Sequence, residues 1–145
     1  MPPSSPLASR LVEFFDQWGI DFETMCRSFD EYFAPDCVWE NPGPQVTHGP
    51  AEAVDKVIKS SNAGPLAVDT IRVEMVNIAE ADGIVYTERI DHLVRADGTV
   101  TLSIPVAGVT EFAEDGRIQR WREYADVAGA VKAAAKDVVA KDAAN

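Results

Sequence analysis

The chain has 145 residues, 46% of them hydrophobic and 26% charged, and this composition predicts a single soluble, globular domain over residues 1–145. The 13 basic and 24 acidic residues give a formal net charge of −11, which repels phosphate backbones and anionic membranes, so we expect no nucleic-acid or membrane partner. No apolar run approaches the ~20 residues of a membrane helix, and the start is not a signal peptide. Cys26 and Cys37 lack metal-ligand spacing, which predicts buried hydrophobes, no metal site and a reducing, cytoplasmic location.

Two helices are predicted near the N-terminus. Residues 1–6 are rich in proline and serine and are expected to be loose. Apolar residues recur at helical spacing from Leu7 to Trp18, and this helix is expected to end near Gly19. Asp21 is suited to cap a second helix, whose apolar stripe consists of Met25, Phe29, Tyr32 and Phe33.

A strand, a loop and a third helix are predicted next. Ala34-Pro35-Asp36 should end the second helix, and residues 37–41 are typical of a short strand stopped by Pro42. Alternation then places Cys37, Trp39 and Asn41 on one side of this strand. The segment NPGPQVTHG is predicted to be a loop, and Pro50 suits the first turn of a helix over AEAVDKVIKSS.

The second half of the chain changes to strand periodicity. Four long alternating or apolar segments are separated by the turn signals AEADG, RADG and AEDG, and they are Ala67 to Ala79, Gly83 to Arg95, Thr99 to Ala113 and Arg117 to Ala125. Such short connections predict an antiparallel meander. The fold class is therefore α+β, with N-terminal helices across one face of a cone-shaped, curved, mostly antiparallel sheet. The alanine- and lysine-rich tail, about 128–145, has helix propensity and is expected to be loose or accessory, or to cover a partner subunit.

Charged residues interrupt the predicted strand at Ile84 to Val94. Alternation places Arg89 and Asp91 on one face, beside apolar neighbours, and Glu88 and His92 on the other. Because neither face is cleanly polar, we expect something to cover both sides of this strand. A charge on a covered face must be paired, although a surface pair on a sheet edge has the same pattern.

Three segments can bring polar groups into the mouth of such a cone. They contribute Trp39 with Asn41, Arg89 with Asp91, and Glu123, which shares its strand face with Trp121. The planar fork of an arginine can hold two carboxylates together in an apolar pocket. With one carboxyl protonated and the other ionised, the first can give a proton while the second takes one.

These motifs resemble a known family. ERID within the strand, combined with the ending DGRIQRWREYAD, is similar to the limonene-1,2-epoxide hydrolase family, part of the ketosteroid isomerase-like, nuclear transport factor 2-like (SnoaL-like) superfamily. The resemblance runs from the first helix to Asp126 and includes FAPDCVWENP, HGPAEA and DGRI. It implies a ketosteroid isomerase-like fold, a homodimer, and one-step acid/base hydrolysis of an epoxide with no cofactor, metal or covalent intermediate.

The resemblance also implies roles for individual residues. Asp91 would be the general acid, Arg89 the bridge between the carboxylates, Glu123 the general base, and Asn41 a residue that positions the water. The family usually has Asp where this chain has Glu123, and Tyr where it has Trp39. The longer Glu shifts the water, and the indole of Trp only donates hydrogen bonds. The pocket is expected to suit a terpene- or steroid-like epoxide, with walls formed by the aromatic residues of the N-terminal helices and by Trp39, Trp121, Leu102, Ile104 and Val106.

Other interpretations remain open from the sequence. Arg89 with Asp91 could be a structural pair, Glu123 a solvated strand end, and Asn41 a loop cap. His48 and His92 are interpreted as structural. The alternative functions are an epoxide-opening or polyketide-type cyclase, an isomerase, and a domain that only binds an apolar ligand. A ketosteroid isomerase would need carboxylates near Asn41 and Gly108 that this chain lacks.

Overall fold

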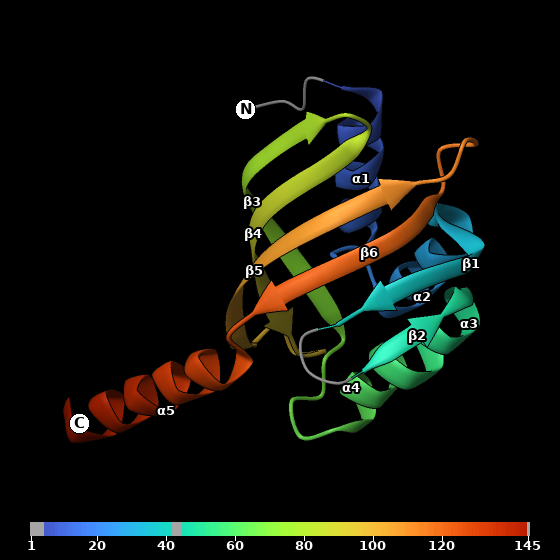
Figure 1. Ribbon diagram of the computed structural model, residues 1–145. Coiled ribbons are helices and arrows are strands. Elements are labelled where there is room, and N and C mark those ends of the chain that lie inside the picture. The colour runs from blue at the N-terminus through green and yellow to red at the C-terminus, as the bar shows by residue number, and fades with distance from the viewer. Residues whose placement is uncertain (1–4, 42–44, 145) are drawn as a thin grey trace.

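The computed structural model describes the backbone of residues 5–41 and 45–144, with side chains described to residue 139. Helices and strands are both present, as an α+β fold requires (Figure 1). The helical elements are α1 (Pro6–Gln17), α2 (Phe22–Tyr32), α3 (Gly49–Glu52), the π-helix η1 (Ala53–Ile58), α4 (Lys59–Ala63) and α5 (Val127–Ala144). The strands are β1 (Phe33–Glu40), β2 (Val46–His48), β3 (Thr70–Ala81), β4 (Ile84–Val94), β5 (Val100–Phe112) and β6 (Ile118–Ala125).

The first two helices begin at side-chain caps. Ser5 accepts a hydrogen bond from the backbone N–H of Ala8, and Asp21 accepts one from Thr24, as predicted for Asp21. The prediction that residues 5 and 6 are loose is wrong, because Ser5 caps α1 and Pro6 begins it; residues 1–4 lie outside the described part. Phe33 is also not helical. It is the first residue of β1, so this strand begins before Pro35 instead of after it.

All six strands form one sheet with the order β2-β1-β6-β5-β4-β3. The four long strands pair as the predicted antiparallel meander. Two features were not predicted. β1 pairs with β6 in parallel, with Trp39 opposite Trp121, and β2 lies within the segment that was expected to be a loop.

The segment after β2 is one helical run made of α3, η1 and α4, which confirms the predicted helix at Pro50. Its first residue, Gly49, has a φ of +81°, and a Cβ at this position would lie 2.8 Å from the carbonyl oxygen of Pro35. Only glycine tolerates both the positive φ and this close approach. Gly49 therefore lets the helical run pack tightly against β1.

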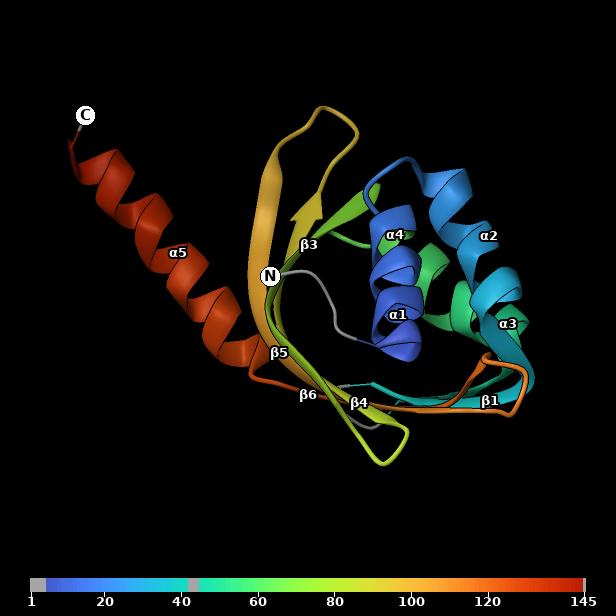
Figure 2. The same ribbon diagram turned by 90° about the horizontal axis from the view of Figure 1, so that it is seen from above.

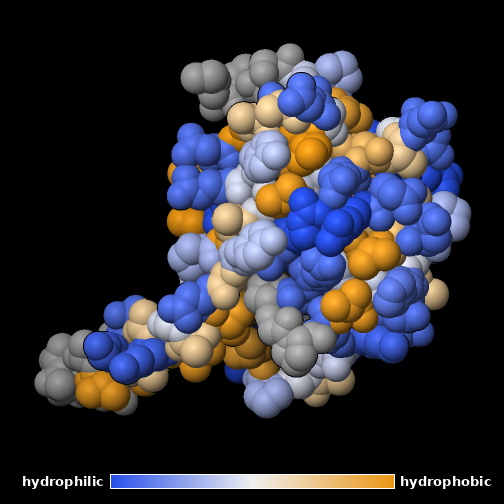
Figure 3. Space-filling view, in the orientation of Figure 1, coloured by the Kyte–Doolittle hydropathy of each residue, from blue (hydrophilic) through white to orange (hydrophobic). Residues whose placement is uncertain are grey.

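The sheet curves around helices α1 to α4, which fill its concave side (Figure 2). The core between them is aromatic and includes Phe14, Phe15, Trp18, Phe29 and Trp121, all 0–2% exposed. The convex side is not covered by this chain along β4, where Tyr86 is 44% exposed and Glu88 is also exposed. The expectation that both faces of this strand are covered is therefore wrong for the single chain. Hydrophilic residues dominate the convex side, with apolar residues between them (Figure 3).

The C-terminal segment forms α5, which agrees with its helix propensity. Only its first part lies against the sheet, near β5, and the rest projects away from the body of the protein (Figure 1). Val138 and Val139 near its end are exposed. None of the described helices is both long enough and apolar enough to cross a membrane.

Candidate active site

The inner face of β4 carries the predicted charged pair. Val85, Thr87, Arg89 and Asp91 are all buried, while Tyr86 and Glu88 on the opposite face are exposed, so the predicted alternation is confirmed. The Arg89 guanidinium is fully buried and the Asp91 side chain is 11% exposed. This pair is therefore not on the surface, and a buried ion pair needs well-formed hydrogen bonds.

Arg89 bridges two carboxylates. Its Nε donates to Asp91 Oδ1 at 2.8 Å and its Nη2 donates to Asp91 Oδ2 at 3.1 Å. The same Nη2 also donates to Oε2 of Glu123. Glu123 reaches this position because β5 lies between β4 and β6, with Gly108 opposite both Thr87 and Glu123. One guanidinium thus joins two buried acids, as the sequence predicted.

Aromatic rings support the guanidinium from behind. Its central carbon lies 4.6 Å from the ring centre of Phe15 and 5.5 Å from that of Trp121. Trp121 in turn stacks on Trp39, with ring centres 4.7 Å apart. Trp121 is fully buried and is not among the described residues that line the cavity, so its prediction as a pocket wall is wrong. It lies deeper in the cone because α1 covers it with Phe14, Phe15 and Trp18.

Trp39 has a second role that the sequence did not predict. Its indole Nε1 donates to Oε1 of Glu123 at 2.7 Å, and the ring also lines the cavity. Both oxygens of Glu123 therefore accept hydrogen bonds from groups that can only donate, Trp39 and Arg89. This pattern favours the ionised form of the carboxylate.

Burial acts in the opposite direction on the same group. Burial raises the pKa of Glu123 and the nearby charge of Asp91 adds to this effect, while Arg89 and the Trp39 hydrogen bond only partly offset it. For Arg89, burial lowers the pKa, but the charges of Glu123 and Asp91 outweigh it and raise the pKa above its usual value. Arg89 is therefore charged at any working pH, and Glu123 is a stronger base than an exposed glutamate.

The raised pKa of Glu123 predicts a pH-dependent effect on stability. A raised pKa means that folding favours the protonated form of Glu123. The stabilisation that Glu123 contributes is therefore fully present below the pKa of ~4.3 that it has in the unfolded chain, and it is lost as the pH rises through its pKa in the folded protein. We expect the melting temperature of wild type to fall relative to that of Glu123→Gln between pH 4 and pH 8. Thermal unfolding across this range measures the difference, with exposed Glu114→Gln as control. If the melting temperature of wild type instead rises relative to that of Glu123→Gln as the pH increases, the result would contradict the raised pKa of Glu123.

Gly108 on β5 allows the polar groups to come together. A Cβ at this position would lie 2.8 Å from Thr87 Oγ1, 3.3 Å from Arg89 Nη1 and 3.4 Å from Trp121 Nε1. Each of these three buried atoms has no hydrogen-bond partner among the described residues. A side chain here would therefore press on the hydroxyl of Thr87 and on the guanidinium that bridges the carboxylates.

We accordingly expect Gly108→Ala to lower the free energy of unfolding by about 1–3 kcal/mol, the usual cost of overpacking a core. Urea denaturation measures this change. Adding Thr87→Ala removes the nearest atom and should recover part of the loss. If Gly108→Ala is as stable as wild type, the close approach of Thr87 does not constrain this position.

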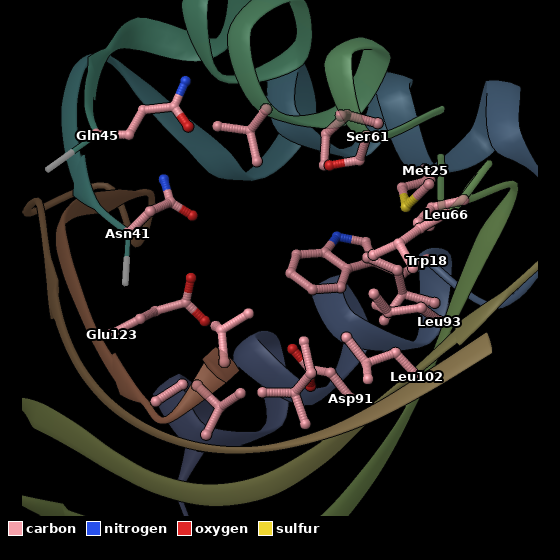
Figure 4. A pocket seen from close by; sticks show the side chains of 18 of the residues that line it. Trp18, Met25, Asn41, Gln45, Ser61, Leu66, Asp91, Leu93, Leu102 and Glu123 are labelled. Carbon is pink, nitrogen blue, oxygen red and sulfur yellow. The ribbon is translucent and has the colours of Figure 1, made fainter. Parts of the chain in front are cut away.

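A cavity of about 280 Å³ opens in front of the carboxylates, at the lower end of the size range of ligand pockets (Figure 4). Asp91, Glu123 and Asn41 all line it, so the three predicted segments do converge. Of the predicted walls, Trp39, Leu102, Ile104 and Val106 line this cavity, and so does Trp18 from the helix aromatics. Sequence reasoning missed further wall residues from the helices and β3, which are Met25, Val57, Ile58 and Ile71. Their helical and strand periodicity indicated only that they were buried.

Asn41 follows β1 directly and lies at the edge of the cavity. Its backbone N–H donates to the carbonyl of Gln45 at 3.1 Å, and its side-chain Nδ2 is buried with no partner among the described residues. The side chain of Asn41 therefore lines the cavity, and the hydrogen bond across the loop comes from its backbone and not from a side-chain loop cap. Pro42, the residue expected to stop the strand, lies outside the described residues.

The two histidines lie away from this cavity. His48 is exposed at the end of β2. His92 lies on the convex face, where Nδ1 is 2.7 Å from Ser103 Oγ and Nε2 is 3.1 Å from Glu74 Oε1. Both positions agree with the prediction that neither histidine belongs to the site. Among the described residues, no cluster of His, Cys, Asp and Glu has the arrangement of a metal site.

Solved structures share this fold. An M. tuberculosis LEH-like epoxide hydrolase is 23% identical, with a TM-score of 0.69 over 96% of both chains. A hypothetical protein with a ketosteroid isomerase-like fold from Catenulispora acidiphila, in complex with trimethylamine, is 13% identical, with a TM-score of 0.67 over 90% of this chain and 91% of that one. A putative isomerase of the SnoaL-like family from Agrobacterium tumefaciens is 12% identical, with a TM-score of 0.61 over 84% of this chain and 99% of that one.

These likenesses establish a ketosteroid isomerase-like, SnoaL-like fold, as the sequence predicted. A more specific comparison comes from the amino-acid sequence. The family described as limonene-1,2-epoxide hydrolase catalytic domain matches residues 11–136, which run from the middle of α1 to the middle of α5 and include all the residues around Arg89. The chain therefore belongs to the limonene-1,2-epoxide hydrolase family.

Proposed function

We propose that this protein hydrolyses an apolar epoxide to a vicinal diol in one acid/base step. The observation that carries the proposal is the pair of carboxylates, Asp91 and Glu123, held by one buried guanidinium at the wall of a mostly apolar cavity. A cavity of this kind holds an apolar ring or chain, and the two acids are its only described ionisable lining residues. Opening an epoxide needs a proton for the leaving oxygen and a base for the attacking water.

The charges of the cluster allow one acid and one base to coexist. Two ionised carboxylates with one guanidinium carry a net charge of −1, and one added proton makes the cluster neutral. Hydrogen bonding does not separate the two acids, because each accepts two hydrogen bonds from groups that can only donate, and the family resemblance assigns the role of proton donor to Asp91. Asp91 can then protonate the epoxide oxygen while Glu123 remains the base.

The attacking water is assigned to the space between Glu123 and Asn41. Glu123 takes a proton from the water as it attacks, and the raised pKa of this carboxyl strengthens it as a base. The amide of Asn41 offers both a donor and an acceptor to the same water. Arg89 holds both acids and so fixes the distance between the proton donor and the base.

Turnover of a panel of cyclic, alkyl and aryl epoxides in oxygen-18 water tests this proposal. Mass spectrometry should find the diol with one labelled oxygen from at least one member of the panel, and a blank without enzyme corrects for spontaneous opening. If folded protein forms no labelled diol from any of these epoxides, the proposal fails. Comparing the turnover of terpene-like and steroid-like epoxides in the same panel identifies which class the site prefers.

One observation favours a second candidate, an epoxide-opening cyclase. Trp39 stands where the family usually has a tyrosine, so no phenol hydroxyl is present to accept a hydrogen bond from the water. The indole N–H of Trp39 also donates to Oε1 of Glu123, so this oxygen is already occupied. A hydroxyl group of the substrate itself could then be the nucleophile. The cyclic ether would carry no oxygen-18, so epoxy alcohols in the same labelled water distinguish the two reactions.

The homodimer is proposed on the resemblance alone. Light scattering on the purified full chain measures the mass directly, and a value near twice 15.8 kDa is expected. A mass of one chain at micromolar concentration would contradict it.

A further inference from the structure

The cavity is polar at one end and apolar at the other. Figure 4 shows Asn41, Gln45 and Glu123 together on one side, and Trp18, Met25, Leu66, Leu93 and Leu102 on the opposite side, where Ser61 is the one labelled polar side chain. Asp91 lies between the two groups. The proton donor is therefore flanked by the base on one side and by an apolar wall on the other.

The apolar end is formed by the protein core. Met25, Leu102 and Trp18 are each at most 3% exposed, and they come from α2, β5 and the end of α1. Met25 and Trp18 belong to the aromatic core, so this part of the wall is held in place from behind. An apolar arm placed here leaves water, and each buried methylene should raise kcat/KM about fourfold until the arm fills the space.

The chemistry of ring opening relates the two ends. The nucleophile approaches a carbon from the side opposite the carbon–oxygen bond that breaks. With the epoxide oxygen at Asp91 and the water at Glu123, the attacked carbon must face Glu123. An arm on that carbon would crowd Asn41 and Gln45, whereas an arm on the other carbon can extend to the apolar end.

We propose that the site takes epoxides with a single apolar arm and directs water to the unsubstituted carbon, an inference that rests on the hydrolase function proposed above. A bond forms between the water oxygen and that carbon, and the bond from the carbon to the epoxide oxygen breaks. Glu123 takes the proton of the water, and Asp91 gives its proton to the epoxide oxygen. Transfer of a proton from Glu123 back to Asp91 restores the site, so one water is consumed. No bond to the substituted carbon breaks, so its configuration is retained.

The test uses each enantiomer of 1,2-epoxyoctane in oxygen-18 water with the wild-type protein. Mass fragmentation of the diol should place the label on carbon 1, and chiral chromatography should show retained configuration at carbon 2. Label on carbon 2 with inverted configuration would overturn this inference and leave the hydrolase intact. Absence of diol from every epoxide would overturn both.

A variant tests the apolar end itself. Met25→Trp fills this end, so the ratio of kcat/KM for 1,2-epoxyoctane to that for 1,2-epoxypropane should fall about tenfold or more. Arg27→Trp adds the same side chain to the exposed face of the same helix and serves as the matched control. Leu102→Phe on β5 gives a second measurement if Met25→Trp does not fold. An unchanged ratio in a folded variant would place the arm elsewhere.

Discussion

Replacing Arg89 by methionine is expected to lower the free energy of unfolding by about 3–5 kcal/mol at neutral pH, the cost of leaving buried charges without their partner. Within the described part of the chain, Arg89 is the only ion-pair partner of Asp91 and of Glu123. Both carboxylates are buried, and without the guanidinium they repel each other in a medium that screens charge poorly. Phe15 and Trp121 behind Arg89 offer no compensating charge.

Urea denaturation at pH 7.5 and pH 4.5 measures this effect. The loss should shrink at the lower pH, because burial raises the pKa of Glu123 and its protonation removes one of the two repelling charges. The triple variant Arg89→Met/Asp91→Asn/Glu123→Gln has no charge in the cluster and should recover much of the lost stability. A change below about 1 kcal/mol in Arg89→Met would mean that water reaches the carboxylates.

Replacing Asp91 by asparagine is expected to lower kcat by about 10²–10⁴ while the fold persists, the usual range for loss of a general acid. Asparagine cannot donate an acidic proton to the epoxide oxygen. It keeps an acceptor oxygen for Arg89, and the guanidinium still pairs with Glu123, so one positive charge faces one negative charge. The variant therefore separates chemistry from stability.

Initial rates with a reactive epoxide and thermal unfolding of the same samples provide the two readouts. Asp137→Asn, an exposed residue on α5, controls for the loss of one carboxylate. A purely structural pair predicts the opposite pattern, with stability reduced and no specific loss of turnover. Unchanged turnover in a folded Asp91→Asn variant would contradict the acid role.

Local patterns in the sequence determined much of this protein. The cap at Asp21 and the alternation along β4 depend only on neighbouring residues, so they could be predicted without the fold. The short turns between the last four strands predicted the antiparallel meander, because such connections join adjacent strands. The alternation therefore also placed Arg89 and Asp91 together on an inner face.

Only the tertiary structure decided which distant groups meet. The contact of Trp39 with Glu123 joins residues 84 positions apart and depends on the parallel pairing of β1 with β6. The register of two distant segments is set by how the whole core packs, and no local pattern encodes it. The depth of Trp121 under α1 and the separation of the cavity into a polar and an apolar end have the same cause. The sequence by itself placed Arg89 and Asp91 on one face of a strand, and the packing of helices against the curved sheet buried that face and decided what stands in front of it.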